Sequence, residues 1–111
     1  MHLKLPELTK RYYTIGEVAE IFDVNTSLLR YWEKEFPNLQ PKKNSKGNRA
    51  YTPKDIERIH LVFHLVKERG FTIDGARKKL RENHEDVAKE AEVVSRLMNV
   101  REKIMNLKRA L

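Results

Sequence analysis

The sequence has 111 residues and no cysteine. This absence excludes disulfides, thiolate metal ligands and cysteine nucleophiles together. No apolar run approaches the roughly 18 residues of a membrane-spanning helix, and the start, MHLKLPELTKR, lacks the apolar core of a signal peptide. We therefore expect one small cytoplasmic domain with, at most, one appended element.

Basic residues outnumber acidic ones, 23 to 16, which gives a net charge of +7. A net charge of +6 falls within residues 1–82 and only +1 within residues 83–111. A positive excess in the first part of the chain predicts a polyanion partner for that part. A mildly basic, solvated surface is the alternative explanation.

Two short helices are predicted between residues 14 and 36. The first begins with a capping box, Thr14 to Glu17 in the sequence TIGE, and the second begins at Asn25 or Thr26. Pro37 ends the second helix because the residue before a proline avoids helical angles. The predicted apolar faces consist of Ile15, Val18, Ala19 and Phe22 in the first helix, and Leu28, Leu29, Trp32 and Phe36 in the second.

The opposite face of the second helix is polar and consists of Ser27, Arg30, Tyr31 and Lys34. Two helices joined by a tight turn, the second with a polar outward face, are typical of a helix-turn-helix. Ser27 and Arg30 suit contacts to base edges in DNA, since arginine commonly binds guanine through two hydrogen bonds. Tyr31 and Lys34 suit contacts to phosphates.

Residues 40–51 predict a β-hairpin, with a tip between Asn44 and Asn48 that contains Gly47. The segment has no acidic residue. A basic hairpin after a recognition helix has the form of a wing. Its side chains Lys42, Lys43 and Lys46 would lie along phosphates.

Two further helices are predicted after the hairpin. Thr52 caps the third helix, Pro53 takes its first position, and Gly70 stands where a C-terminal cap belongs. Its predicted buried stripe is Ile56, Ile59, Phe63 and Val66. Thr72 caps a fourth helix, which the sequence ENHED at 82–86 separates from the last segment.

The last segment carries a heptad seam of Val93, Leu97, Val100, Ile104, Leu107 and Leu111. A helix from about residue 86 to the end would be roughly 39 Å long at 1.5 Å per residue, too long to lie wholly on the preceding small domain. We therefore expect this helix to pair with a copy of itself. Pairing with a different protein is the alternative.

Three stretches together resemble the MerR family of bacterial transcription regulators: YYTIGEVAEIFDVNTSLLRYWEKEF, NRAYTPKDIERIHLVFHLVKERGFTIDGARKKL and the final heptad helix. The resemblance covers residues 12–82 by motif and the remainder by architecture. It implies a mainly α fold: a winged helix-turn-helix with a small β-hairpin wing, a second helix pair and a long C-terminal helix that dimerises as an antiparallel coiled coil. The expected division is an N-terminal arm at 1–11, a DNA-binding domain at 12–84 and a dimerisation helix at 85–111.

The resemblance also implies the function, which is transcription regulation by a homodimer. The dimer would bind a pseudo-palindromic promoter operator, bend and untwist it, and contact RNA polymerase at the promoter. The expected DNA-binding residues are Thr26, Ser27, Arg30, Tyr31, Lys34, Lys42, Lys43, Lys46, Arg49 and Tyr51. Many members carry an arginine where this chain has Ser27, so its base preference should differ or weaken. Nothing follows the dimer helix, so a chain complete at residue 111 should lack an inducer site.

No catalytic residues, metal site or cofactor are expected. His60 and His64 lie one helical turn apart, but a third ligand is missing for zinc. Glu33 and Glu35 have the pattern of ordinary helix-surface charges, and no nucleophile–base pair is evident. The sequence leaves two alternatives to a promoter regulator: an architectural or recombination-accessory DNA-binding protein, and a protein-interaction module.

Overall fold

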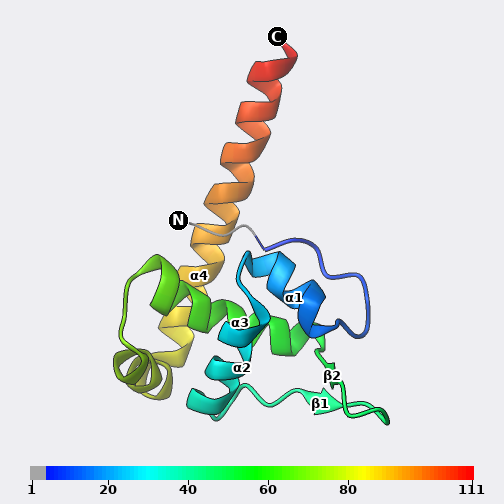
Figure 1. Ribbon diagram of the computed structural model, residues 1–111. Coiled ribbons are helices and arrows are strands. Elements are labelled where there is room, and N and C mark those ends of the chain that lie inside the picture. The colour runs from blue at the N-terminus through cyan, green and yellow to red at the C-terminus, as the bar shows by residue number, and fades with distance from the viewer. Residues whose placement is uncertain (1–4) are drawn as a thin grey trace. The chain divides into compact units, whose positions relative to one another are not determined.

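A computed structural model describes residues 5–111 and is mainly α, as predicted. The elements in chain order are α1 (Ile15–Phe22), α2 (Thr26–Glu35), β1 (Lys42–Lys43), β2 (Arg49–Ala50), α3 (Pro53–Phe63), the π-helical segment η1 (His64–Glu68) and α4 (Ile73–Ala110) (Figure 1). The described chain forms two compact units, residues 6–63 and residues 64–111 with Leu5. The domain boundaries expected near residues 11 and 84 stay predictions.

The predicted helix starts are confirmed by side-chain caps. Thr14 and Glu17 form the reciprocal capping box of α1, and Asn25, not Thr26, caps α2 by accepting a hydrogen bond from the Leu28 amide (2.9 Å). Between the helices, Asp23 has the left-handed φ of 51° that closes the turn. These local bonds satisfy backbone amides that have no partner inside a helix, so they define where each helix begins.

The core of residues 6–63 lies where α1, α2 and α3 turn their apolar faces inward. Phe22 lies against Phe63, with ring centroids 5.4 Å apart, and Trp32 is completely buried. The predicted core position of Trp32 is therefore confirmed. The buried apolar residues of this unit are Tyr13, Val18, Ala19, Phe22, Leu29, Trp32, Phe36, Leu39, Tyr51, Ile56, Ile59, Val62 and Phe63.

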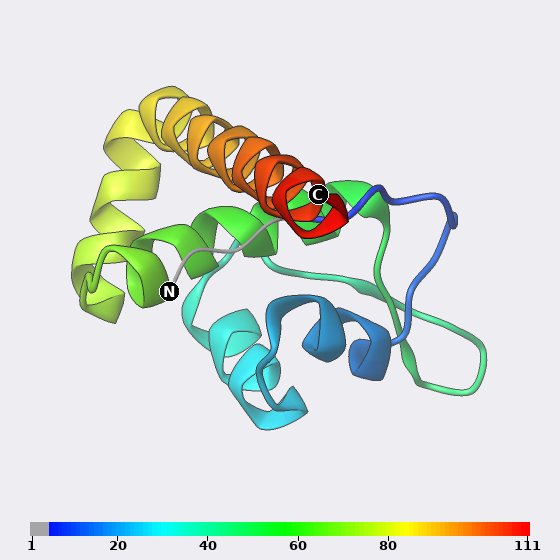
Figure 2. The ribbon, with the colours of Figure 1, turned by 90° about the horizontal axis from the view of Figure 1, so that it is seen from above.

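The predicted hairpin is present, although its strands are only two residues each. Lys42 pairs with Ala50 and Lys43 with Arg49, in antiparallel register. Tyr13, from the segment before α1, forms a further bridge: its amide donates to the Tyr51 carbonyl (2.8 Å). The hairpin loop extends away from α1 and α2 (Figure 2). The pairing ends after two residues because the chain turns at Asn44.

One predicted helix is interrupted. We expected a regular helix with Val66 in its buried stripe, but α3 ends at Phe63 and the chain continues as the π-helical η1. The Arg69 amide donates to the His64 carbonyl five residues back, at 2.9 Å. A π turn adds one residue and shifts the buried face, so Leu65 is fully buried and Val66 is only half-buried. Gly70, with φ of 74°, ends the segment as predicted.

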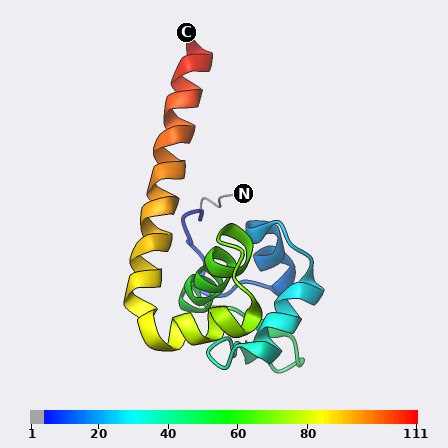
Figure 3. The same cartoon turned by 90° about the vertical axis from the view of Figure 1, so that its left-hand side faces the viewer.

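Helix α4 starts at its predicted cap, Thr72, whose hydroxyl accepts from the Gly75 amide (3.0 Å). The chain is helical on both sides of Asn83, which lies in the ENHED sequence expected to separate the fourth helix from the last segment, and which alone in α4 has non-helical angles (φ −136°, ψ 43°). The result is a kink, visible within α4 in Figure 3. Within residues 5–111, no helix is long and apolar enough to cross a membrane.

Candidate nucleic-acid interface

Helix α2 presents the polar face that its sequence predicts. Ser27, Arg30 and Lys34 are exposed, and the side chain of Tyr31 is 46% exposed. Thr26 is half-buried at the first position of the helix. Leu29 and Trp32 are buried against the core. Because successive positions on a helix are about 100° apart, the polar face of α2 therefore points away from the core.

The wing presents a second basic surface. Lys42, Lys43 and Lys46 are exposed on the hairpin. Its tip is held by Asn44, whose side-chain oxygen accepts from the amides of Lys46 (2.9 Å) and Asn48 (3.0 Å). Gly47 has φ of 79°, a conformation that L side chains rarely adopt. Lys46 is thus carried on a turn with a defined backbone, and Lys42 and Lys43 lie just before that turn in β1.

A partly buried hydrogen-bond cluster of Glu33, Gln40, Arg49 and Tyr51 joins the wing to α2. The carboxylate of Glu33 accepts from Arg49 Nε (2.7 Å) through Oε2 and from the Tyr51 hydroxyl through Oε1. The Glu33 backbone carbonyl accepts from Gln40 Nε2 (3.1 Å). The Glu33 side chain is only 12% exposed and that of Arg49 is 27% exposed. Burial, and then Glu33, hold the pKa of Tyr51 above its ordinary value.

This cluster changes how one predicted DNA-binding residue, Tyr51, and one predicted surface charge, Glu33, are placed. Tyr51 is completely buried, so its hydroxyl faces Glu33 and not a ligand. The sequence pattern predicted that Glu33 is an ordinary surface charge. That prediction is wrong, because Glu33 is the acceptor at the centre of the cluster. No spacing rule connects residue 33 with residues 49 and 51, because a hairpin of variable geometry separates them.

The predicted seam residues lie exposed on α4. Val93, Val100, Leu97, Ile104 and Leu107 are between 53% and 66% exposed, and Leu111 is fully exposed. Exposed apolar side chains at heptad spacing are the pattern of a helix face that pairs with another helix. Their pairing stays a prediction.

His60 and His64 are both buried. The ring of His60 lies 6.4 Å from that of Phe22, centroid to centroid. His64 Nδ1 lies 2.7 Å from Glu68 Oε1, and its Nε2 lies 3.0 Å from Glu90 Oε1. Over residues 5–111, no group of three or more histidine, cysteine or acidic side chains is arranged to hold a metal ion. Arg77, in the basic run 77–79, pairs with Asp74.

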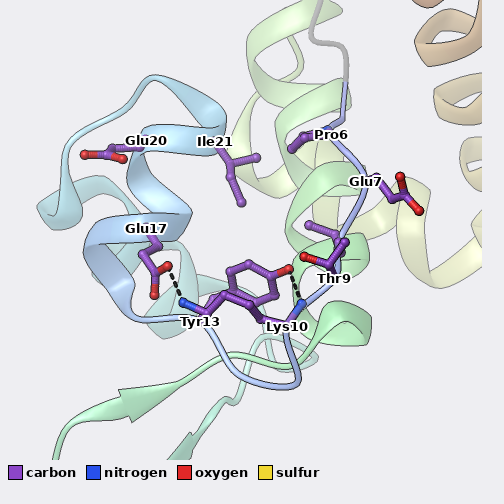
Figure 4. A pocket seen from close by; sticks show the side chains of 9 residues that line it. Pro6, Glu7, Thr9, Lys10, Tyr13, Glu17, Glu20 and Ile21 are labelled. Carbon is purple, nitrogen blue, oxygen red and sulfur yellow. Dashed lines mark hydrogen bonds and ion pairs between the residues drawn. The ribbon is translucent and has the colours of Figure 1, made fainter.

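An open pocket of about 380 Å³ lies between α1 and the preceding segment (Figure 4). Lys10 spans its lower side: its ammonium group pairs with Glu17 and its amide donates to the Tyr13 hydroxyl (2.9 Å). The bond from the Lys10 ammonium group, and then that from the Thr14 amide, hold the pKa of Glu17 below its ordinary value. The pair between Lys10 and Glu17 thus fastens the segment to α1.

These elements define a winged helix-turn-helix protein. Residues 13–83 match the family described as "MerR HTH family regulatory protein". The chain belongs to the MerR family, as its motifs indicated.

Individual relatives differ in how much they share with the chain. The mercuric resistance operon regulatory protein of Bacillus cereus is 30% identical over 101 residues, which are 87% of this chain and 76% of the relative. The transcriptional regulator MlrA of Salmonella typhimurium is 43% identical over 50 residues, 45% of this chain. The chain spans only 21% of MlrA's length.

Solved structures share the fold. HiNmlR, described as a MerR family regulator lacking the sensor domain and bound to promoter DNA, has a TM-score of 0.53 and 24% identity, over 89% of this chain and 81% of that one. A MerR family regulator from Bacillus cereus has a TM-score of 0.56 and 19% identity, over 89% and 75%.

Proposed function

We propose that this protein is a sequence-specific, DNA-binding transcription regulator that acts as a homodimer on a pseudo-palindromic promoter operator and bends and untwists it. The observation that carries the proposal is the exposed face of α2 beside a basic hairpin that Glu33 bonds to the same helix. Membership of the MerR family supports it. The proposed site of action is the cytoplasm, and the proposed activity is binding without catalysis.

The two basic surfaces take different roles in this proposal. Arg30 reads a base edge from the major groove, with Thr26 and Ser27 beside it near the start of α2. Tyr31, Lys34 and the exposed hairpin lysines contact phosphates, which set position and affinity but carry no sequence information. Arg49 contacts a phosphate from the wing. Tyr51 is buried and contributes indirectly, because its hydroxyl donates to Glu33, the residue that also binds Arg49.

The proposed dimer forms through the exposed seam on α4, and its symmetry requires an inverted repeat in the DNA. RNA polymerase at the promoter is the proposed second partner. The exposed apolar seam of residues 93–111 and membership of the family support the proposed dimer, and membership of the family alone supports RNA polymerase as a partner.

Selection from a random duplex library at near-physiological salt, followed by sequencing, tests the proposal. An enriched inverted repeat is the expected result. Retention without enrichment would instead support an architectural DNA-binding protein. If no duplex is retained even at low salt, where phosphate contacts are strongest, the basic surfaces have another partner and the proposal is wrong.

A further inference from the structure

The wing is attached to α2 at both of its ends, and both attachments meet at one residue. Gln40, two residues before β1, donates to the Glu33 carbonyl, while Arg49 in β2 donates to the Glu33 carboxylate. Tyr51, directly after β2, donates to the second carboxylate oxygen. Three hydrogen bonds from different parts of the hairpin therefore converge on the last turn of α2.

The chemistry of these bonds suits a fixed attachment. A bond between a guanidinium and a carboxylate is charge-assisted and stronger than a neutral hydrogen bond. Since the Glu33 side chain is only 12% exposed, water competes weakly for its oxygens. Both oxygens are occupied, each by a different donor, which restricts rotation of the carboxylate and of both donors together.

The same bond orients Arg49. Its guanidinium donates to Glu33 through Nε, and Nη1 and Nη2 make no hydrogen bond within residues 5–111. With Nε occupied, the two terminal nitrogens form the available edge of the planar fork, the edge that matches a phosphate. Glu33 thus neutralises the positive charge of Arg49 but holds its guanidinium in a single orientation.

We propose that Glu33 is a positioning residue that holds the wing against the recognition helix and orients Arg49 toward a DNA phosphate. The inference rests on the proposed function for the identity of the phosphate, but the attachment itself is a property of the free protein. The competing explanation is that Glu33 only balances the charge of Arg49. The two explanations predict opposite effects when the charge of Glu33 is removed.

The first measurement needs no DNA. In Glu33→Gln, hydrogen exchange of the Arg49 Nε–H and of the Tyr51 amide should accelerate about tenfold, as expected when one or two coupled hydrogen bonds are lost. The Val18 amide, which donates to the Thr14 carbonyl at the start of α1, serves as the internal reference. The control variant Glu57→Gln removes an equal charge from an exposed position on α3 and should change neither rate. Unchanged exchange in Glu33→Gln would overturn the attachment.

The second measurement uses the full chain and two duplexes, the one enriched by selection and a mixed-sequence duplex of equal length. Removal of a negative charge alone strengthens binding to any DNA, so a charge-balancing role predicts equal or tighter binding by Glu33→Gln. The positioning role predicts weaker binding to the selected duplex, by about tenfold. Glu57→Gln should bind the selected duplex at least as tightly as the wild type.

A double-mutant cycle with Arg49→Ala completes the test. In the wild-type background Arg49→Ala should weaken binding about tenfold, and in the Glu33→Gln background less than about threefold, because the arginine has already lost its orientation. An equal loss in both backgrounds would overturn the orientation of Arg49. If the wild type binds neither duplex, the proposed function fails, and the exchange measurement alone decides whether Glu33 holds the wing.

Discussion

Arg30 Nη1 donates a hydrogen bond to Thr26 Oγ1, 3.3 Å away and one turn earlier on α2. The guanidinium is therefore directed toward the N-terminal end of the helix, on its exposed face. In helix-turn-helix proteins this end of the recognition helix contacts base edges. The orientation supports the role proposed for Arg30 in reading sequence.

Arg30→Ala should relax discrimination at one base pair by roughly 1–3 kcal/mol, because it removes a bidentate contact to a base. Arg30→Lys is the matched variant: it keeps the charge but lacks the planar fork, so it should also lose discrimination while the salt dependence stays unchanged. Binding to a selected duplex and to its single-base variants measures both effects. Intact sequence preference in Arg30→Ala would show that α2 is not the reading helix.

Lys42→Ala should weaken binding to all duplexes alike and lower the slope of log affinity against log salt by about one, since one phosphate contact releases about one counterion. Titrations at several salt concentrations measure the slope. Lys103→Ala, an exposed lysine on the last part of α4, is the control and should leave the slope unchanged. Equal slopes for Lys42→Ala and the wild type would remove the hairpin lysine from the interface.

Ile104→Glu should convert the proposed dimer into a monomer, because it places a charge in an apolar seam that two helices must share. Asn106→Glu introduces the same charge about 200° round the helix from Ile104, away from the seam, and should leave the dimer intact. Sedimentation equilibrium at micromolar concentration distinguishes the two states. A monomeric wild type would argue that the seam pairs with a different protein.

Glu90→Ala should lower the free energy of unfolding by about 1–3 kcal/mol, because it leaves Nε2 of the buried His64 without its hydrogen-bond partner. Arg69 also loses its partner in this variant. Glu92→Ala is the control: its exposed pair with Arg96 should contribute less than about 1 kcal/mol. Urea unfolding at a fixed protein concentration compares the variants, and equal stabilities would contradict a structural role for the His64 contacts.

Stability should decline at alkaline pH through Tyr51. Its raised pKa means that the folded protein keeps the phenolic proton at a pH where the unfolded chain has lost it. The free energy of unfolding should therefore fall as pH rises above the ordinary tyrosine pKa of about 10. Tyr51→Phe lacks this proton, so the decline of its stability with pH should be shallower. Parallel pH profiles would place the Tyr51 hydroxyl in water.

Local patterns account for most of the fold. The caps Thr14, Asn25 and Thr72 each bond an amide within three residues, so short spacing in the sequence is enough to predict them. The two faces of α2 follow from helical periodicity in the same way. Periodicity failed where the helical period itself changed, in the π turn at His64–Glu68.

The sequence by itself determined the class of protein, the order of its helices and the polar face of α2, because caps, helical stripes and family motifs are encoded by residues close together in the chain. The tertiary structure decided which side chains face a ligand and which support them. Tyr51, expected to contact DNA, is buried, and Glu33, expected to be a surface charge, accepts hydrogen bonds from Arg49 and Tyr51, because the hairpin brings residue 33 to residues 49 and 51. Both placements depend on burial and on hydrogen bonds across 16 and 18 residues, which no local pattern records.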